Sequence, residues 1–408
     1  MRSPSVENTK FIAANELFSK SLDVPASKSR ANRMLLLASI TPGETVITNI
    51  PSSSDVIDMI SSLKAIGLKI ETPSEGRVIV KNSFPQCEQK SASPVVVECG
   101  YGGTTTRFLA ALLILGCNTY HLEASGHMRQ RPMSEMIKPL SELGAEVKHN
   151  VDGVWFFIKG PVTQKKKSIA VDAARSTQFA SALAMVMSLW GGEVRPTGMN
   201  ASEEYFKMTE DAIEQARNGH WSIPLDFSSL SYPLALAATS GEVIINNFER
   251  IDGFQPDSIF IQILKEMGAS VEISENTLRV NKNELKAWSG DCSGFPDLVP
   301  TLAYVCSYAS GTSRLDKLDV LKHKESDRLL EITKLLKMNH IEFSVDGDSL
   351  SIIGGKRHQD QTLYQAPDDH RMIMVAALFM RINGGGEIEN YDHVKKSYPY
   401  FFEDLIES

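Results

Sequence analysis

Six times along this 408-residue chain, a short polar loop runs directly into an apolar stretch of helical length. The loops cover residues 27–33, 100–107, 174–179, 226–232, 295–298 and 368–372. Each apolar stretch ends near a glycine, the residue at which helices commonly stop. The six glycines are Gly43, Gly116, Gly191, Gly241, Gly311 and Gly384. Units repeated in this way cannot bury their apolar faces alone, so we expect them to pack on one another.

A second repeat runs in step with the first. It predicts a helix, a tight turn and two short strands, and it occurs at residues 63–80, 141–158, 264–280 and 335–352. Alternatively, the repeats are a coincidence among unrelated amphipathic helices. This interpretation is the weaker one, because the two repeats keep the same spacing relative to each other along the chain. The pattern therefore indicates copies of one unit that mixes helices and strands.

Length and charge limit the class of protein. A chain of 408 residues exceeds one ordinary core and predicts two domains of about 200 residues each. The net charge of −8 disfavours broad binding to nucleic acid or to a membrane surface. The longest apolar run, residues 108–117, is about half a membrane span. We therefore expect small-molecule partners, with no nucleic acid and no membrane.

The N-terminal residues and the cysteines indicate the compartment. The first twenty residues mix acidic, basic and polar side chains and lack the apolar core of an export signal. The five cysteines show no CxxC spacing and no metal-ligand grouping with the nine histidines. Reduced thiols in a cytoplasmic protein fit best, and we expect neither a metal nor an organic cofactor.

The six polar loops place backbone N–H groups and fixed cations at the starts of helices. A helix N-terminus carries a partial positive charge and unpaired N–H donors, so it favours anions. Arginine suits a bidentate grip on phosphate or carboxylate, and lysine adds a point charge. The cations in question are Lys28, Arg33, Arg107, Arg131, Lys324, Arg328, Arg371 and Lys396. They indicate a substrate with at least two anionic groups.

Eight strings of residues resemble, in family order, the 5-enolpyruvylshikimate-3-phosphate synthase family. They are PASKSRANR at 25–33, GTTTR at 103–107, RP at 131–132, STQ at 176–178, PD at 296–297, KESDR at 324–328, DHRM at 369–372 and KSYP at 396–399. Each string alone is a weak signal, whereas eight in order over almost the whole chain make chance implausible.

The resemblance implies a fold. It is a two-domain, inside-out α/β barrel of six repeated βαβαββ-type units, with helix N-termini facing the interdomain cleft. The implied inserted domain is 23–224, on the shikimate 3-phosphate side, and the second domain combines 1–22 with 225–408; each has three repeats. We expect the protein to act as a monomer.

The resemblance also implies a reaction: transfer of the enolpyruvyl group of phosphoenolpyruvate to the 5-hydroxyl of shikimate 3-phosphate, with release of phosphate. The implied shikimate 3-phosphate contacts are Lys28, Ser29, Arg33, Ser176, Thr177, Gln178, Ser202, Tyr205, Asp297 and Lys324. The implied phosphoenolpyruvate contacts are Lys28, Gly103, Arg131, Gln178, Arg328, His370, Arg371 and Lys396. Helix capping by residues 176–178 and simple packing of His370 are the structural alternatives.

Proton transfer is assigned by the same resemblance. Asp297 is expected beside the 5-hydroxyl as base, Glu325 near the methylene carbon as acid, and Lys28 as a proton donor or a stabiliser of charge on the bridging oxygen. Alternatively, Asp297 marks a helix start, and Glu325 pairs with Lys322 or Arg328 on a helix face.

Three residues depart from the family pattern. Tyr101 replaces a common Asn, Phe108 replaces a common Pro, and Val320 stands where many members place an Asn that touches shikimate 3-phosphate. These changes bear on affinity and inhibitor response more than on the class of reaction.

Three alternatives remain open. The sister enzyme that acts on UDP-N-acetylglucosamine typically has a reactive Cys where this chain has Gly126. A binding or regulatory protein without turnover is the second, and a transferase for an altered shikimate phosphate is the third. Turnover and comparison of acceptors distinguish them.

Overall fold

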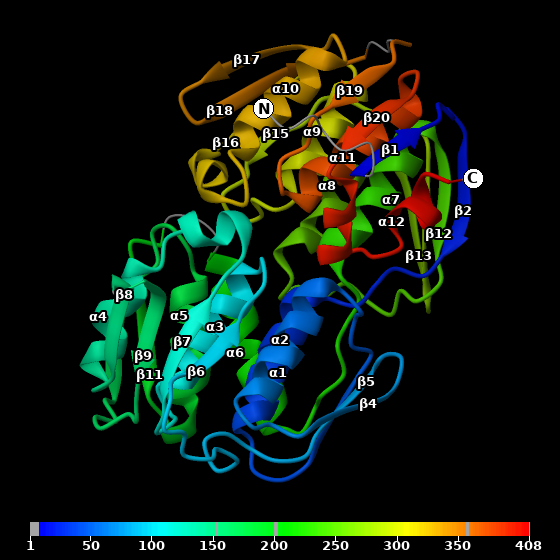
Figure 1. Cartoon of the computed structure of the whole chain (residues 1–408). Coiled ribbons are helices and arrows are strands. Elements are labelled where there is room, and N and C mark those ends of the chain that lie inside the picture. Colours follow the sequence, from blue (N-terminus) through cyan, green and yellow to red (C-terminus); the bar gives the residue numbers. More distant parts are fainter. Residues whose placement is uncertain (1–7, 152, 200–202, 356–358, 408) are drawn as a thin grey trace. The chain divides into compact units, whose positions relative to one another are not determined.

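The computed structural model describes residues 8–151, 153–199, 203–355 and 359–407. The chain divides into two compact units, of which unit 1 combines Met1–Pro25 with Leu225–Ser408 and unit 2 is Ala26–Pro224. In Figure 1 the helices of unit 2 run from blue to green and those of unit 1 from green to red. The mixed α/β class predicted from the sequence is confirmed.

Unit 2 contains three sheets within the described residues, ordered β3-β5-β4, β6-β7-β9-β8 and β10-β11. The strands are β3 (Thr45–Thr48), β4 (Ile70–Ser74), β5 (Arg77–Val80), β6 (Val95–Glu98), β7 (Thr119–Glu123), β8 (Glu146–Val151), β9 (Val154–Lys159), β10 (Ser168–Asp172) and β11 (Glu193–Thr197). The helices are α1 (Lys28–Ile40), α2 (Ser54–Ala65), α3 (Gly103–Leu113), α4 (Ile137–Glu142), α5 (Gln178–Met187) and α6 (Glu203–Arg217), with short 3₁₀ turns η2 (Gly126–Gln130), η3 (Ser134–Met136) and η4 (Ser188–Trp190).

Unit 1 also contains three sheets within the described residues, ordered β1-β20-β19, β13-β14-β12-β2 and β15-β16-β18-β17. The strands are β1 (Thr9–Ile12), β2 (Phe18–Leu22), β12 (Gly241–Ile245), β13 (Ser270–Ser274), β14 (Thr277–Asn281), β15 (Ser289–Asp291), β16 (Thr312–Asp316), β17 (Glu342–Asp346), β18 (Ser349–Ile353), β19 (Thr362–Tyr364) and β20 (Gly386–Glu389). The helices are α7 (Phe227–Ser240), α8 (Ile259–Met267), α9 (Val299–Tyr308), α10 (Arg328–Met338), α11 (His370–Ile382) and α12 (Phe401–Leu405), with 3₁₀ turns η5 (Pro256–Ser258), η6 (Asp319–His323) and η7 (Tyr391–Lys396).

The three four-stranded sheets repeat one plan. In each, a parallel pair is extended by an antiparallel hairpin: β6 and β7 are parallel, β9 pairs antiparallel with β7, and β8 pairs antiparallel with β9. The sheets β2-β12-β14-β13 and β15-β16-β18-β17 follow the same directions. The crossover between the parallel strands contains α3 for β6 and β7 and α9 for β15 and β16, whereas the connection from β2 to β12 contains all of unit 2 followed by α7.

The six predicted loop-to-helix transitions are confirmed. They produce α1, α3, α5, α7, α9 and α11. These helices are buried on nearly every side, and all thirteen residues of α11 are buried, because their sequences are apolar all round rather than along one stripe. Figure 1 shows α7, α9 and α11 together inside unit 1.

The second predicted repeat is also confirmed. Each of its four copies forms a helix followed by an antiparallel hairpin: α2 with β4 and β5, α4 with β8 and β9, α8 with β13 and β14, and α10 with β17 and β18. Glycine in the left-handed conformation ends α8, where Gly268 has φ +99°, as helix C-termini favour. Each unit has its own apolar core.

A pair of leucines tests the core of unit 2. Leu183 on α5 is fully buried, whereas Leu189, six residues later, is 46% exposed. We expect Leu183→Ala to lower the free energy of unfolding by about 2–5 kcal/mol because it leaves a cavity. Leu189→Ala is the control and should change it by less than about 0.5 kcal/mol. Urea unfolding followed by tryptophan fluorescence measures both, since three of the four tryptophans lie in unit 2. Equal losses in the two variants would contradict the packing described.

Candidate active site

The six buried helices lack acidic residues in their first turns. No acidic residue occurs in the first turn of α1, α3, α5, α7, α9 or α11. In contrast, α2, α6 and α10 carry Asp or Glu in the first turn, the usual way of offsetting the helix dipole. The N-cap carboxylates Asp226 of α7 and Asp369 of α11 offset part of the helix dipole, whereas α1, α3, α5 and α9 have no acidic N-cap and keep more of their partial positive charge.

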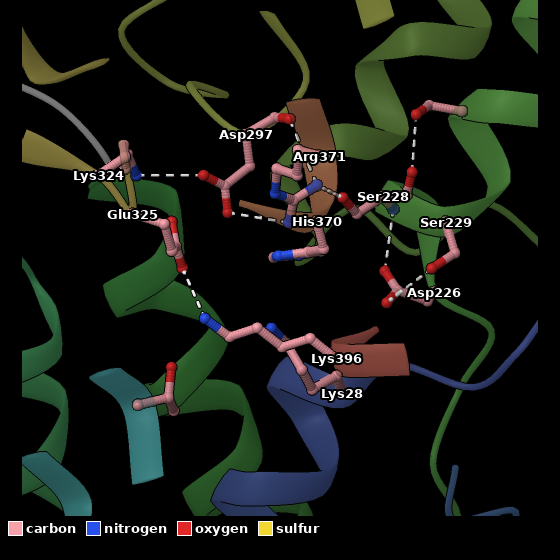
Figure 2. Close-up of polar contacts among 12 residues, drawn as sticks. Lys28, Asp226, Ser228, Ser229, Asp297, Lys324, Glu325, His370, Arg371 and Lys396 are labelled. Atoms are coloured by element: carbon pink, nitrogen blue, oxygen red, sulfur yellow. Dashed lines mark hydrogen bonds and ion pairs between the residues drawn. The ribbon is translucent and has the colours of Figure 1, made fainter. Parts of the chain in front are cut away.

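In unit 1 the predicted residues gather around one carboxylate. Asp297 lies on the turn that precedes α9, and three cations reach it: Lys324 Nζ at 3.2 Å, Arg328 Nη1 at 2.7 Å and Arg371 Nη2 at 3.1 Å. Figure 2 shows Lys324 and Arg371 on opposite sides of this carboxylate. Asp297 and Lys324 lie in the segments before α9 and α10, and Arg328 and Arg371 lie in the first turns of α10 and α11, so the packing of these helices brings the charges together.

Burial and charge oppose each other at Asp297. Burial alone raises the pKa of this carboxyl, but Arg371, Lys324 and Arg328 outweigh that effect and hold its pKa well below the usual range. The pKa of Lys324 is lowered by burial, which outweighs the attraction of Asp297. At neutral pH Asp297 is therefore an ionised carboxylate that is paired with three cations.

Arg328, the first residue of α10, is the centre of the cluster. Its guanidinium is almost fully buried and donates to three carboxylates: Asp297, Glu325 Oε2 at 2.6 Å and Asp369 Oδ2 at 2.8 Å. Burial lowers the pKa of Arg328, but the three acids outweigh burial and raise it overall. A buried guanidinium with three charged acceptors is rigidly oriented.

Glu325 has a second cationic partner. Its Oε1 lies 3.4 Å from Lys396 Nζ, and Lys396 is buried at the end of η7 (Figure 2). Glu325 pairs with Arg328, as the structural alternative expected, and it also contacts Lys396. The pairing with Arg328 is therefore itself part of the charge cluster. Lys322 instead pairs with Asp319.

Asp369, His370 and Arg371 start α11. Asp369 caps the helix by accepting from the Arg371 backbone N–H at 3.1 Å, and it also accepts from Ser326 at 3.0 Å. His370 is buried, with Nδ1 4.0 Å from Asp369 Oδ1. The Arg371 guanidinium donates to Ser228 Oγ and to the Asp297 carbonyl at 3.3 Å.

In unit 2, Lys28 occupies the first position of α1. Its Nζ is 3.1 Å from Asp55 Oδ2, in the first turn of α2, and both side chains are mostly buried. A buried ion pair of this kind is destabilised strongly when one partner is removed. Lys28 is therefore held in place by Asp55.

Gly103 begins α3 and lies under the Arg131 guanidinium. A Cβ at this glycine would lie 2.4 Å from Arg131 Nη1 and 3.3 Å from Arg107 Nη1. The position therefore accommodates only glycine while Arg131 keeps its place.

Arg107, one turn along α3, organises the start of α5. Its Nη1 donates to Gln178 Oε1 at 2.6 Å and to Ser176 Oγ at 3.4 Å, and its guanidinium stacks on Phe179, 4.7 Å from the ring centroid. Gln178 also donates to Thr104 at 3.0 Å. The predicted capping role of Ser176 is present too, since Ser176 Oγ accepts from the Gln178 N–H at 3.3 Å.

Arg33 is a buried cation of a different kind. Its donors reach Thr209 Oγ1 at 2.8 Å, the Ser29 carbonyl at 2.9 Å and the Tyr205 carbonyl at 3.1 Å, and no carboxylate among the described residues pairs with it. Burial, followed by repulsion from Arg30, lowers the pKa of Arg33 to about 9. Within the described part of the chain, the cation is balanced by dipoles and by the Phe108 ring, whose centroid lies 5.4 Å from the guanidinium carbon.

The remaining predicted residues are placed as follows. Thr177 is the buried N-cap position of α5, while Ser202 lies outside the described residues. Among the family departures, Phe108 packs against Arg33, Tyr101 is 48% exposed, and Val320 is half-buried within η6. Thus the predicted residues form one group in unit 1 and another in unit 2.

Sequence reasoning missed three polar side chains in these groups: Asp55, Ser228 and Asp369. Ser228 and Asp369 occur in the polar loops, so their positions carried a signal that was not used. Asp55 lies outside those loops and looks like an ordinary acidic residue at the start of a helix.

Other kinds of site receive no support from the described residues. Within them, no three His, Cys, Asp or Glu side chains are grouped so as to hold a metal ion. None of the described helices is long and apolar enough to cross a membrane. All five cysteines are free thiols.

Comparison with known proteins adds a family. The EPSP synthase family model, described as 3-phosphoshikimate 1-carboxyvinyltransferase, matches residues 13–219 and 213–405. A protein of that name from Thermococcus kodakarensis is 33% identical over 405 residues, which cover 94% of this chain and 96% of the relative. One from Syntrophobacter fumaroxidans is 32% identical, covering 94% and 95%. The solved EPSP synthase of Acinetobacter baumannii has a TM-score of 0.76 at 22% identity and covers 98% of each chain, which supports the fold.

The charge cluster predicts a dependence of stability on acid. Because the pKa of Asp297 is depressed in the folded state, its contribution is complete above the unfolded pKa of about 4 and is lost as pH falls through the lower folded value. We expect Asp297→Asn to lower the stability near pH 7 by about 3 kcal/mol, since three cations lose their shared partner, and to reduce the further loss below pH 4.

Thermal unfolding from pH 3 to 7 in a phosphate-free buffer measures both effects. The exposed Asp346→Asn at the end of β17 is the control and should behave as the wild type. If the stability of Asp297→Asn falls as steeply below about pH 4 as that of the wild type, Asp297 is not the group responsible for the acid dependence.

Proposed function

The chain belongs to the EPSP synthase family, and from that premise we propose how its residues perform the family's reaction. The enzyme transfers the enolpyruvyl group of phosphoenolpyruvate to the 5-hydroxyl of shikimate 3-phosphate and releases phosphate, a step of aromatic amino-acid biosynthesis in the shikimate pathway. The observation that carries this conclusion is the match of the family model along nearly the whole chain.

The chemistry requires two proton movements. In the addition, the 5-hydroxyl oxygen bonds to C2 of phosphoenolpyruvate and loses its proton, while the methylene carbon gains one. In the elimination, the C–O bond to phosphate breaks and a proton leaves the methyl group, which restores the double bond. The protein must therefore orient two anions and supply a base and an acid.

The cations of unit 1 suit phosphoenolpyruvate. Arg328, Arg371 and Lys396, with His370, would hold its phosphate and carboxylate, assisted by Arg131, Gly103, Gln178 and Lys28 of unit 2. In the free protein Arg371 and Lys396 are paired with Asp297 and Glu325. An arriving anion would take over part of this pairing, because phosphate offers more charge and more acceptor oxygens than one carboxylate.

This exchange would activate Asp297 as a base. A carboxylate whose pKa lies far below neutrality is a weak base. When phosphoenolpyruvate draws Arg371 toward itself, Asp297 loses an attraction that keeps its pKa low, and its burial then favours proton uptake. The base would thus become effective only after the substrate is bound.

Glu325 and Lys28 are the proposed proton donors. Glu325 would deliver the proton to the methylene carbon, with Arg328 and Lys396 fixing its two oxygens. Lys28 would stabilise negative charge on the bridging oxygen, where an oriented cation in a dry site acts strongly. Asp55 would keep Lys28 in position.

Shikimate 3-phosphate would be bound mainly by unit 2. Ser176, Thr177 and Ser202 would bond its phosphate, while Ser29, Arg33 and Tyr205 would face its ring hydroxyls or carboxylate; Gln178, Lys28, Asp297 and Lys324 complete the set. Arg33 supports this most directly, because a buried cation without a carboxylate partner among the described residues favours a bound anion.

The finer architecture is part of the proposal. We infer that the six sheets represent six copies of one unit in an inside-out α/β barrel, with residues 23–224 as the shikimate 3-phosphate domain. The repeated sheet plan and the matching buried helices support it. A monomeric, cytoplasmic enzyme that does not bind nucleic acid remains the prediction made from the sequence.

The decisive experiment measures phosphate release from phosphoenolpyruvate with and without shikimate 3-phosphate, and identifies the product by mass. Release that requires both substrates is expected. Release that requires a UDP-sugar or another shikimate phosphate would replace the acceptor, and shikimate 3-phosphate binding without release would indicate a binding protein.

Gly103→Ala tests the phosphoenolpyruvate site. The added methyl group would overlap Arg131 Nη1, the end of a flexible side chain, so the fold should be kept while the guanidinium moves. We expect the KM for phosphoenolpyruvate to rise by about tenfold or more, with the KM for shikimate 3-phosphate within about twofold. Steady-state kinetics measure this, and Gly253→Ala, at a site with open space and without a positive φ, is a control for the substitution itself. An unchanged KM for phosphoenolpyruvate would contradict the placement of Arg131.

Two variants test the proton-transfer roles. Asp297→Asn should lower kcat by about 10²–10⁴-fold, the usual contribution of a positioned base. Lys28→Met combined with Asp55→Asn should also lose most turnover while avoiding an unpaired buried carboxylate. Asp55→Asn alone is the matched control that retains Lys28. Near-normal kcat in a folded Asp297→Asn variant would remove Asp297 from the mechanism.

A further inference from the structure

A buried threonine that the mechanism above does not use contacts the side chain of Arg33. Thr209, on α6, is fully buried, and its Oγ1 accepts a hydrogen bond from Arg33 Nε at 2.8 Å. We propose that Thr209 is a positioning residue, whose hydroxyl fixes the Arg33 guanidinium in the orientation that shikimate 3-phosphate requires. The inference rests on the proposed function of Arg33 and extends it to a side chain that has no assigned contact with substrate.

The direction of this hydrogen bond follows from the chemistry of its two groups. A guanidinium only donates, so the Thr209 hydroxyl must accept from Arg33 Nε. The hydroxyl proton then goes to the Tyr205 carbonyl, 3.1 Å away, or to Ser181 Oγ at 2.8 Å. Either choice leaves a Thr209 lone pair for Arg33, because a hydroxyl accepts through two lone pairs.

Thr209 and Tyr205 hold one edge of the guanidinium together. They are four residues apart on α6 and therefore lie on the same face of that helix. The Tyr205 carbonyl accepts from Arg33 Nη2 at 3.1 Å, and the Ser29 carbonyl accepts from Nη1 at 2.9 Å. A planar guanidinium held at all three nitrogens has a fixed orientation. These contacts use three of its five N–H groups, and the described residues offer no acceptor to the other two, which suits an incoming anion.

A neighbouring arginine of α1 is held differently by the same helix. Arg30 is also almost fully buried, but it forms a salt bridge with Asp211 of α6 and donates to the Met208 carbonyl at 3.2 Å. The charge of Arg30 is therefore balanced within the protein. Two residues before Asp211, Thr209 offers Arg33 a neutral acceptor instead. The arginine is thus oriented while its charge is kept for a bound anion.

The Thr209 hydroxyl also connects three helices that would bind shikimate 3-phosphate. Thr209 lies on α6, Arg33 on α1, and the Ser181 hydroxyl on α5. Ser176 and Thr177, which are proposed to bond the phosphate, lie immediately before α5. Thr209 therefore sets the position of Arg33 relative to these residues, and its loss should affect this substrate more than phosphoenolpyruvate.

Three variants separate positioning from structure. Thr209→Val removes the hydroxyl while keeping the branched shape, and it should raise the KM for shikimate 3-phosphate by about 5- to 10-fold, with the KM for phosphoenolpyruvate within about twofold. Thr209→Ser keeps the hydroxyl and should stay within about threefold of the wild type. Arg33→Met combined with Thr209→Val should be no worse than Arg33→Met alone, because both act through one contact.

Thr239→Val is the matched control. Thr239 is a buried helical threonine of α7, whose Oγ1 donates to the Ala235 carbonyl, four residues earlier, at 2.9 Å and lies 2.9 Å from the Tyr304 hydroxyl. It lies near the end of α7, whereas the site residue Ser228 lies at the start of that helix. Both KM values of this variant should remain within about twofold of the wild type.

Several outcomes would overturn the proposal. They are an unchanged KM for shikimate 3-phosphate in Thr209→Val, an equal rise of both KM values, additive effects in the double variant, and a Thr209→Ser variant as impaired as Thr209→Val. If Thr209→Val does not fold, Thr209→Ala is decided by the same criteria. If the wild type binds shikimate 3-phosphate in calorimetry but shows no turnover, the proposed function fails alone, and Kd replaces KM in every comparison. If the wild type does not bind shikimate 3-phosphate, both the proposed function and this inference fail.

Discussion

The buried guanidinium of Arg328 is the interaction on which the site of unit 1 depends. It donates to Asp297, Glu325 and Asp369 at once, and these acids come from three separate loops. Without that cation, three carboxylates would lie close together with their repulsion unscreened in a region of low dielectric. With it, each acid has a fixed direction, while Asp297 also pairs with Lys324 and Arg371, and Glu325 also pairs with Lys396. The geometry of the proposed base and acid is therefore set by one arginine.

Much of the secondary structure could be predicted because it depends on local pattern. The stretch after Arg33 and the stretch after Arg371 are apolar on all sides, which indicates buried helices wherever they pack. The hairpin of β13 and β14 follows a glycine stop at Gly268 and a short turn, so it too is encoded locally. Strand order is different, since β12 pairs with β2 more than two hundred residues away, and no local pattern determines such a partner.

The residues of the candidate site also divide into those that local sequence predicts and those that depend on distant contacts. Positively charged residues in the polar loops were found because arginine and lysine there have a clear chemical use. Two of their acidic partners, Asp55 and Asp369, were missed because they occupy positions where an acidic residue stabilises a helix start for ordinary reasons. Asp369 does cap α11, yet it also holds Arg328, 41 residues earlier in the chain. A residue with two roles is recognised by the simpler one until tertiary contacts are known.

Arg33 and Arg371 represent two ways of preparing a buried cation for an anion. Arg33 is balanced by carbonyls, a hydroxyl and an aromatic face, so its charge is available at once and burial depresses its pKa. Arg371 is balanced by a carboxylate that must be displaced, so part of the binding energy is used to release Asp297. The first arrangement favours affinity, whereas the second couples binding to the reactivity of the base.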